Sequence, residues 1–366
     1  MIYPAARTPV SNAADQYRAT GRDGQPTGLV AAGCLVFLLI LASGCWSRSD
    51  PGVVVYAALD SEFSKPILED FTRETGIAVR PKFDLESTKT VGLTNLIMAE
   101  AEQPRADVFW NNEILNTLRL EKKGLLAAYR SPTAGSYPEL FRSPDGAWHG
   151  FAARARVLLV NTDQVDQGEF PNSIHDLADR KWRGKIGMAK PLFGTTATHA
   201  ACLFAAWGDQ RAKDFFQKLK ANEIQVMAGN KQVALAVASG QLAFGITDTD
   251  DAIIELEHGH SVAIVYPDRE ADQLGTLFIP NTLAIIKGGP HPHEARRLVD
   301  YLLQPAVETR LAQGASAQIP LNPQVEAKVR IETPRTVKAM PADFSRGAEM
   351  WDMAAEFLDD EFGGAG

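Results

Sequence analysis

The sequence predicts an α/β fold in which two lobes are joined by long crossing strands. Short β-rich runs repeatedly give way to a polar turn and then to a helical apolar pattern, which is typical of parallel strands with right-handed crossovers. Two extended segments, 150–161 and 275–286, are longer than the runs around them and are suited to cross between lobes. With 366 residues, 45% of them hydrophobic, the chain is long enough for two packed domains.

The N-terminal residues 1–52 differ from the rest of the chain in composition. An uncharged apolar run, 28–45, follows a polar and lightly basic opening stretch. A membrane-spanning helix needs about 20 apolar residues, so the run fits the hydrophobic region of a secretory signal better. Its end, Ala42-Ser-Gly-Cys45, resembles a bacterial lipobox, in which the cysteine is lipidated. We expect a signal peptide over 1–45 and a tether over 46–52, with an uncleaved signal anchor as the alternative.

The first lobe is expected to begin with residues 53–152. Three β-rich runs, 53–58, 77–83 and 106–110, are each followed by polar residues and a helical pattern. Because the carboxyl ends of parallel strands meet at one edge of a sheet, these polar turns are expected to converge on one cleft. The candidate ligand-binding residues on them are Asp60, Ser87, Thr88, Asn112 and Glu113.

The outgoing crossing strand carries two arginines, Arg154 and Arg156. A guanidinium group can hold a phosphate or a carboxylate through two hydrogen bonds, so Arg154 is a candidate ligand-binding residue. The alternative is that one of them, Arg156 in particular, pairs with an acidic residue and stabilises the hinge.

The second lobe is expected over 153–278. Gly194, Thr195 and Thr196 lie in a turn that opens a helix, where free backbone N–H groups and hydroxyls bind anions. Cys202 follows in the apolar pattern of the same helix and is expected to be a small buried side chain. The spacing of the three cysteines matches neither a disulfide framework nor a zinc site.

An acidic segment follows the apolar run 242–246 directly. Thr247, Asp248 and Asp250 are candidate ligand-binding residues there, because ligands of open α/β sheets bind outside the carboxyl ends of the strands. The alternative is that the acidic residues cap the next helix, which is the role expected of Asp251. Replacing Asp248 by alanine is expected to weaken ligand binding and to leave the fold intact.

The rest of the chain is divided into a return crossing with the second part of lobe 1, 279–325, and a C-terminal helical extension, 326–366. Asn281 lies in the return crossing and is expected to reach the cleft. The pairs His258-Gly-His260 and His291-Pro-His293 suggest metal binding, but no further ligands are evident, so surface positions are expected. The net charge of −8, without a basic run, argues against nucleic-acid partners.

Five residue groups occur in an order that resembles the class II periplasmic solute-binding proteins of ABC importers, specifically their ferric-ion-binding branch. The resemblance covers about 53–325, and it implies two α/β lobes that close on a ligand. It also implies a permease and its ATPase as partners, a monomer, and a place in the periplasm or on the outer cell surface, anchored to the membrane through a lipid on Cys45. The groups are Val54-Val-Tyr56 with Asp60, Phe71-x-x-Glu74-x-Gly76-Ile77, Ala106-Asp-Val-Phe109, Phe193-Gly-Thr-Thr196 and Gly245-Ile-Thr-Asp248.

The resemblance implies a metal ion as ligand, held together with a synergistic anion at the turn 194–196. Ferric-binding relatives carry adjacent tyrosines after the strand that corresponds to 242–246, and this sequence has aspartates there instead. Carboxylate oxygens still suit Fe(III) and other hard cations such as Mg²⁺, Ca²⁺ or Mn²⁺. The candidate metal ligands are Asp60, Glu113, Asp248 and Asp250.

Three functions follow from these features. The first is import of a hard metal cation, and the alternative is binding of an organic cation or zwitterion such as a polyamine or an aminophosphonate. The third is a metal-dependent hydrolase, but the chain has neither a Gly-x-Ser-x-Gly elbow nor a His-Glu-x-x-His helix. We therefore expect a binding protein and not an enzyme.

Overall fold

The computed structural model describes residues 52–84 and 90–364. The chain divides into two compact units, 1–49 and 50–366, and the described residues all belong to the second.

The strands of the second unit are β1 (Val53–Ala57), β2 (Val79–Phe83), β3 (Val108–Asn111), β4 (Leu126–Ala127), β5 (His149–Asn161), β6 (Ile186–Ala189), β7 (Gln225–Met227), β8 (Phe244–Asp248), β9 (Val262–Val265) and β10 (Phe278–Ile286). Its α-helices are α2 (Ser61–Thr75), α3 (Val91–Ala99), α4 (Leu115–Lys122), α5 (Gly194–Trp207), α6 (Asp209–Ala221), α7 (Asn230–Ala238), α8 (Thr249–Glu257), α9 (Pro292–Leu302), α10 (Pro305–Gln313) and α11 (Phe344–Phe362).

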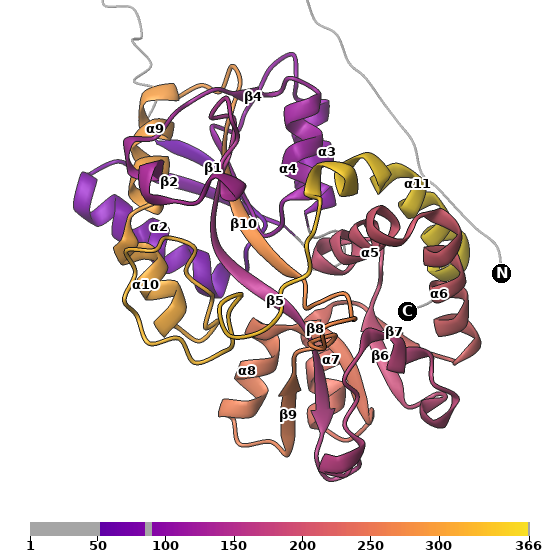
Figure 1. Cartoon of the computed structure of the whole chain (residues 1–366). Coiled ribbons are helices and arrows are strands. Elements are labelled where there is room, and N and C mark those ends of the chain that lie inside the picture. The colour runs from indigo at the N-terminus through magenta and orange to yellow at the C-terminus, as the bar shows by residue number, and fades with distance from the viewer. Residues whose placement is uncertain (1–51, 85–89, 365–366) are drawn as a thin grey trace, which may run out of the picture. The chain divides into compact units, whose positions relative to one another are not determined.

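The strands form one ten-stranded sheet in the order β2-β1-β3-β10-β5-β8-β6-β7, with β4 added to β10 and β9 added to β5. Strand β5 joins its two halves, because its first residues pair with β10 and its last residues pair with β8 and β9 (Figure 1). We call the half around β1 and β3 lobe 1 and the half around β6 and β8 lobe 2. The two-lobed α/β fold is confirmed, with β5 as the predicted crossing strand.

Strand β5 is buried along its whole length. Its residues 157–160 form a continuous apolar run, as expected of a strand covered on both faces. Within the part of β5 that pairs with β10, the register shifts between Pro280 and Asn281, and Ala152 has a φ of +41°. The side chain of Asn281 donates to the carbonyl of Ala152 across this irregularity. Asn281 therefore holds the two crossing strands together.

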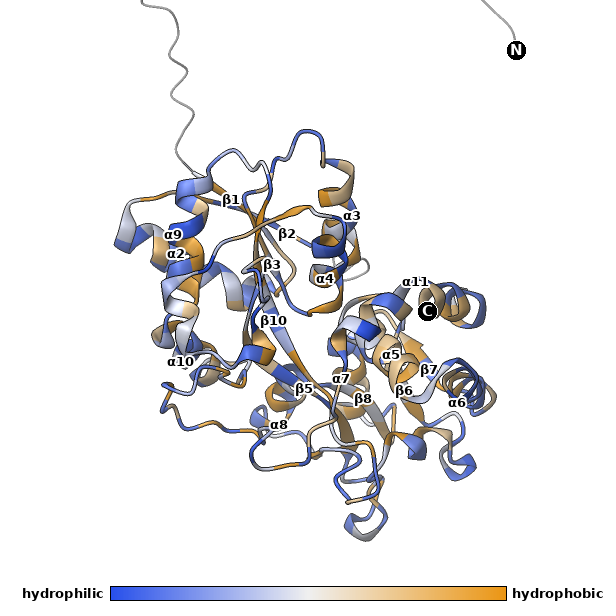
Figure 2. Ribbon diagram, turned by 45° about the horizontal axis from the view of Figure 1, so that its top comes forward, coloured by the Kyte–Doolittle hydropathy of each residue, from blue (hydrophilic) through white to orange (hydrophobic). Residues whose placement is uncertain are grey.

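Each lobe has apolar helix faces against its half of the sheet (Figure 2). In lobe 1, α2 buries Ile67, Leu68 and Phe71, which share one helix face. In lobe 2, α5 and α6 bring the rings of Phe204 and Phe216 within 6.2 Å of each other. Burial of such side chains contributes about 1.5–3 kcal/mol each, and it fixes the strand ends that carry the polar residues.

The acidic segment differs from its prediction. Strand β8 does not end at Ile246 but continues through Asp248, and α8 begins at the next residue without a turn. The reason is the pairing of β8 with β5, which places Asp248 opposite Arg156 in the antiparallel ladder. Asp248 stands at the N-cap of α8, but its side chain makes no capping hydrogen bond.

Helix α11 packs across α4, α5 and α6 (Figure 1). The ring of Phe357 lies edge-on to Phe204 of α5, and the guanidinium of Arg119, from α4, lies over the ring of Trp351. The C-terminal residues thus contact helices that follow strands of both lobes. Among the described residues, none of the helices combines the length and the apolar character needed to cross a bilayer.

Candidate functional site

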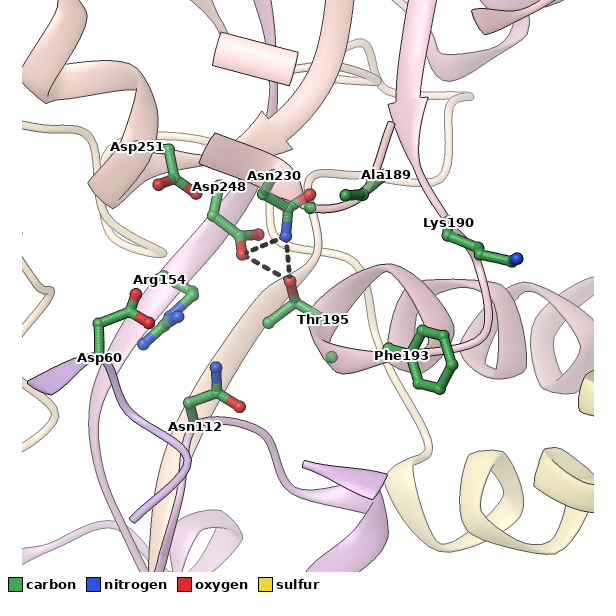
Figure 3. A pocket seen from close by; sticks show the side chains of 13 residues that line it. Asp60, Asn112, Arg154, Ala189, Lys190, Phe193, Thr195, Asn230, Asp248 and Asp251 are labelled. Atoms are coloured by element: carbon green, nitrogen blue, oxygen red, sulfur yellow. Dashed lines mark hydrogen bonds between the residues drawn. The ribbon is translucent and has the colours of Figure 1, made fainter. Parts of the chain in front are cut away.

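A small pocket lies where residues of both lobes and of β5 meet (Figure 3). Lobe 1 contributes the residue before α2 and the residue after β3. Lobe 2 contributes the end of β6, the starts of α5 and α7, and the junction of β8 with α8. The lining residues are Asp60, Asn112, Arg154, Ala189, Lys190, Phe193, Gly194, Thr195, Ala228, Gly229, Asn230, Asp248 and Asp251.

The sequence-predicted residues divide into three groups. Lining the pocket are Asp60, Asn112, Arg154, Gly194, Thr195 and Asp248. Buried outside its lining are Glu113, Thr196, Thr247, Asp250 and Asn281. Outside the described residues lie Ser87, Thr88 and the lipidation candidate Cys45.

Asp248 is bound on both carboxylate oxygens. Arg156 donates to Oδ1 at 2.6 Å, and Thr195 and Asn230 donate to Oδ2 at 2.5 Å and 3.0 Å. Asp248 and Arg156 are almost completely buried. Arg156 also donates to the side chains of Thr195, Thr196 and Asn230. The structure therefore contains the ion pair of Arg156 with an acidic residue, which was one of the two alternatives for this arginine.

Arg154 also forms a buried ion pair, with 3.1 Å between its Nη1 and the carboxylate of Asp250. Its Nη2 donates to Asn281. Burial alone would lower the pKa of the Arg154 guanidinium, but the carboxylates of Asp250, Asp248, Asp60 and Asp251 together raise this pKa above its ordinary value. Four carboxylates thus act on the guanidinium of Arg154. They outnumber the three cationic groups at the site, Arg154, Arg156 and Lys190, so the site keeps an excess of negative charge.

The carboxylate of Glu113 is bound by the first turn of the helix that follows it. Its carboxylate accepts hydrogen bonds from the backbone N–H groups of Leu115 and Asn116, in the first turn of α4. It also accepts from Asn111 and from Thr198 of α5, the latter at 2.8 Å. These donors account for its burial, and Glu113 is not among the lining residues of the pocket.

Asn112 differs from its neighbours, because it is only 2% exposed and its side-chain oxygen has no hydrogen-bond partner among the described residues. Its amide group faces the pocket opposite Thr195 and Arg154 (Figure 3). A buried polar atom without a partner costs about 1–3 kcal/mol, so this oxygen is suited to a ligand. Sequence reasoning found Asn112 but missed Asn230, whose place at the start of α7 carried no motif.

The first turn of α5 forms another wall. Within the described part of the chain, the backbone N–H groups of Gly194, Thr195 and Thr196 have no acceptor, and Phe193 provides no side-chain cap. The first N–H groups of a helix carry partial positive charge, which favours an anionic group. The pocket therefore combines a wall for an anion with carboxylates suited to a cation.

A second pocket shares the lining residues Asp60 and Asp251 with the first. Ser61, Glu62 and Phe83 line this second pocket from lobe 1, and Lys231 and Gln232 line it from lobe 2. The Nζ of Lys231 lies 3.4 Å from a carboxylate oxygen of Glu62. This ion pair spans the second pocket between the lobes.

Comparison with known proteins shows which proteins this chain resembles in sequence and in fold. Iron uptake protein A1 of Synechocystis sp. is 26% identical over 74% of this chain and 78% of its own length. A putative 2-aminoethylphosphonate-binding periplasmic protein of Salmonella typhimurium is 24% identical over 69% of this chain and 73% of its own length. Iron-bound HitA from Pseudomonas aeruginosa superposes with a TM-score of 0.77 at 23% identity, covering 85% of this chain and 99% of HitA.

The family model for bacterial extracellular solute-binding proteins matches residues 107–346. This range runs from β3 to the start of α11 and includes every lining residue except Asp60. The predicted resemblance to periplasmic solute-binding proteins is therefore confirmed, and the chain belongs to the bacterial extracellular solute-binding protein family.

Proposed function

We propose that this protein binds a small organic solute carrying both an ammonium group and an oxyanion, such as an aminoalkylphosphonate, and delivers it to an ABC importer. The observation that carries the proposal is that Asp248 and Asp250, the two buried aspartates named as metal ligands, are already bound by arginines, at 2.6 Å and 3.1 Å. A metal ion would have to compete with these guanidiniums for the same oxygens. An ammonium group needs only one or two acceptors and leaves both pairs in place.

The oxyanion is assigned to the first turn of α5. The N–H groups of residues 194–196 supply donors, and Arg154 lies in the lining of the same pocket. Charge-assisted hydrogen bonds to a phosphonate or carboxylate are about twice as strong as neutral ones. The oxygen of Asn112 would accept from the ammonium group, and the surplus carboxylate charge around Asp60 would attract it.

A second candidate is a hard metal cation with a synergistic anion. Ligand oxygens of Asp248, Asp250 and Asp251 lie within 4.8 Å of one another, which favours a cation. Iron is also named for the Synechocystis relative and for the HitA structure. The lining of the pocket, however, includes no tyrosine among the described residues, so phenolate ligation of Fe(III) has no donor there.

The finer features of the import function remain proposals. A permease and its ATPase would be the partners of the monomeric protein, and a lipid on Cys45 would hold it at the membrane in the periplasm or on the outer cell surface. The boundaries 53–152, 153–278 and 279–325 for the lobes, and 326–366 for a C-terminal extension, also remain proposals. Binding and release of an unchanged solute would require no catalysis.

Asn112→Ala tests the proposal. We expect 2-aminoethylphosphonate to raise the melting temperature of the full-length chain, because a ligand that binds only the folded state stabilises it. The variant should bind it at least ten-fold more weakly in calorimetry, because the oxygen of Asn112 is lost. Its melting temperature without ligand should stay close to that of the parent, since this oxygen has no partner among the described residues.

Melting temperatures measured with a panel of ligands decide between the two candidate functions. The panel should include spermidine, inorganic phosphate, Fe(III) citrate, Mn²⁺ and Ca²⁺. Stabilisation by Fe(III) or another cation, with none by the aminophosphonate, would contradict the proposal and favour the metal candidate. Asn172→Ala is the matched control for the substitution, because Asn172 is exposed and lies outside the pocket.

A further inference from the structure

The C-terminal end of α8 holds a group of side chains that the solute pocket does not use. We infer that Glu255, His258 and His260 form a binding site for a divalent transition-metal cation such as Zn²⁺. We call these three residues the His–Glu cluster. It lies at the opposite end of α8 from Asp248, and the nine residues of the helix separate the two by about 13 Å.

The donor atoms of the His–Glu cluster already lie close together. One ligand atom from each of the three side chains lies within 4.8 Å of the other two. The Nε2 of His260 is 3.4 Å from the Oε2 of Glu255. A zinc ion with bonds of about 2.0–2.2 Å to these atoms fits between them after small rotations of the exposed histidine side chains.

The burial of Glu255 supports the site independently of the distances between the donor atoms. Its side chain is only 5% exposed, yet its Oε2 has no hydrogen-bond partner among the described residues. Apart from the imidazole of His260 at 3.4 Å, no described group compensates for the hydration that this carboxylate oxygen loses on burial, and a bound cation would do so. The nearby Glu257 is different, because it is paired with Arg330.

The backbone brings both histidines to the end of α8 that carries Glu255. Helix α8 ends at Glu257 with His258 as its C-cap, and Gly259 has a φ of +81°, a left-handed conformation that glycine adopts without strain. The chain then turns back, and the N–H of His260 donates to the carbonyl of Glu255 at 3.3 Å. The C-terminal end of a helix carries partial negative charge, which further favours a cation.

The donor set determines the class of metal. Two imidazole nitrogens and one carboxylate oxygen match zinc sites that have three protein ligands, with water in the fourth position. Hard cations such as Mg²⁺ and Ca²⁺ prefer oxygen ligands only, so they are poor candidates here. Both histidines are exposed, and a metal in solution can reach them.

Calorimetric titration of the full-length chain with ZnCl₂ tests the site, using protein that carries no histidine tag and has been treated with a chelator. We expect one zinc ion per chain, and at least ten-fold weaker binding in His258→Ala and in His260→Ala. Glu255→Gln should also weaken binding, and its unchanged melting temperature without metal would show that it folds. His293→Ala is the matched control, because it removes an exposed histidine outside the cluster.

The outcomes separate this site from the solute pocket. Asn112→Ala should leave zinc binding unchanged, and the double variant His258→Ala/His260→Ala should leave 2-aminoethylphosphonate binding unchanged. Absence of zinc binding, or equal zinc binding in the parent and the double variant, would overturn the inference. Failure of the aminophosphonate to bind would count against the proposed function alone.

Discussion

Asp248 was expected to bind the ligand, but its ion pair with Arg156 gives it a structural role. Both are buried, and with Thr195 and Asn230 they form one hydrogen-bonded group in the wall of the pocket. Replacing Asp248 by alanine leaves the guanidinium of Arg156 buried without its counter-ion. Removal of one partner of a buried pair typically costs about 3–5 kcal/mol.

We therefore expect Asp248→Ala to lower the free energy of unfolding by about 3–5 kcal/mol in urea denaturation, against the sequence-based expectation of an intact fold. The double variant Asp248→Leu/Arg156→Leu should be less destabilised than Asp248→Ala, because no buried charge is left alone. Glu223→Ala is the control, since it breaks an exposed pair with Arg183. Equal stability of Asp248→Ala and the parent would contradict the structural role.

The sequence located Asp248 but not its partners. Its position at the end of an apolar run places it at the carboxyl edge of a strand, which periodicity can predict. Its ion pair with Arg156 depends on the register of β8 against β5, two segments about ninety residues apart. Nothing local in either segment specifies that register. The role of Asn281 was missed for the same reason, because it depends on the register of β10 against β5. Glu113 is different, since its carboxylate is bound by N–H groups of the helix that follows it directly.

At the scale of elements, the close contact between β8 and α7 depends on Gly245. A Cβ atom at this position would lie 2.5 Å from Cγ1 of Val233 in α7 and 3.0 Å from the carbonyl oxygen of Gly187 in β6. The helix or the strand would have to move, and α7 carries Asn230 at its start. The glycine thus allows α7 to pack where its first residue reaches the pocket.

Gly245→Ala should therefore lower the free energy of unfolding by about 1–3 kcal/mol, the usual cost of overpacking a core. It should also weaken solute binding, because Asn230 shifts with α7. Urea denaturation and calorimetry measure the two effects. In Gly168→Ala, the control, the added Cβ meets no atom within 4 Å, so stability should stay unchanged. A fully stable Gly245→Ala would show that the contact is easily relieved.

Elements were predicted more reliably than their ends. Apolar spacing identified the helix around Phe71 and the long strand through Arg156, because burial of one face leaves a period in the sequence. The extension of β8 to Asp248 was not foreseen, since polar residues at a strand end are also typical of turns. The ion pair with Arg156 decides between the two, and it is a tertiary contact.

At the scale of the whole molecule, stability at acid pH depends on His199, which is buried on α5. Burial, and to a smaller extent the charge of Arg156, lowers the pKa of the His199 imidazole from 6.5 to about 3. The folded protein therefore excludes a proton that the unfolded chain binds below about pH 6.5. The stability present at neutral pH is thus lost progressively as the pH falls from about 6.5 towards 3.

His199→Gln removes this dependence. Between about pH 5.5 and 4.5 the free energy of unfolding of the parent should fall more steeply than that of the variant, by up to about 1.4 kcal/mol per pH unit. Urea denaturation at several pH values measures both slopes. His149 and His175, whose pKa values are also lowered by burial, act equally in both proteins and cancel in the difference. His293→Gln, at an exposed position, should keep the slope of the parent. Equal slopes in His199→Gln and the parent would show that the imidazole of His199 takes up its proton without unfolding, through a local opening of α5.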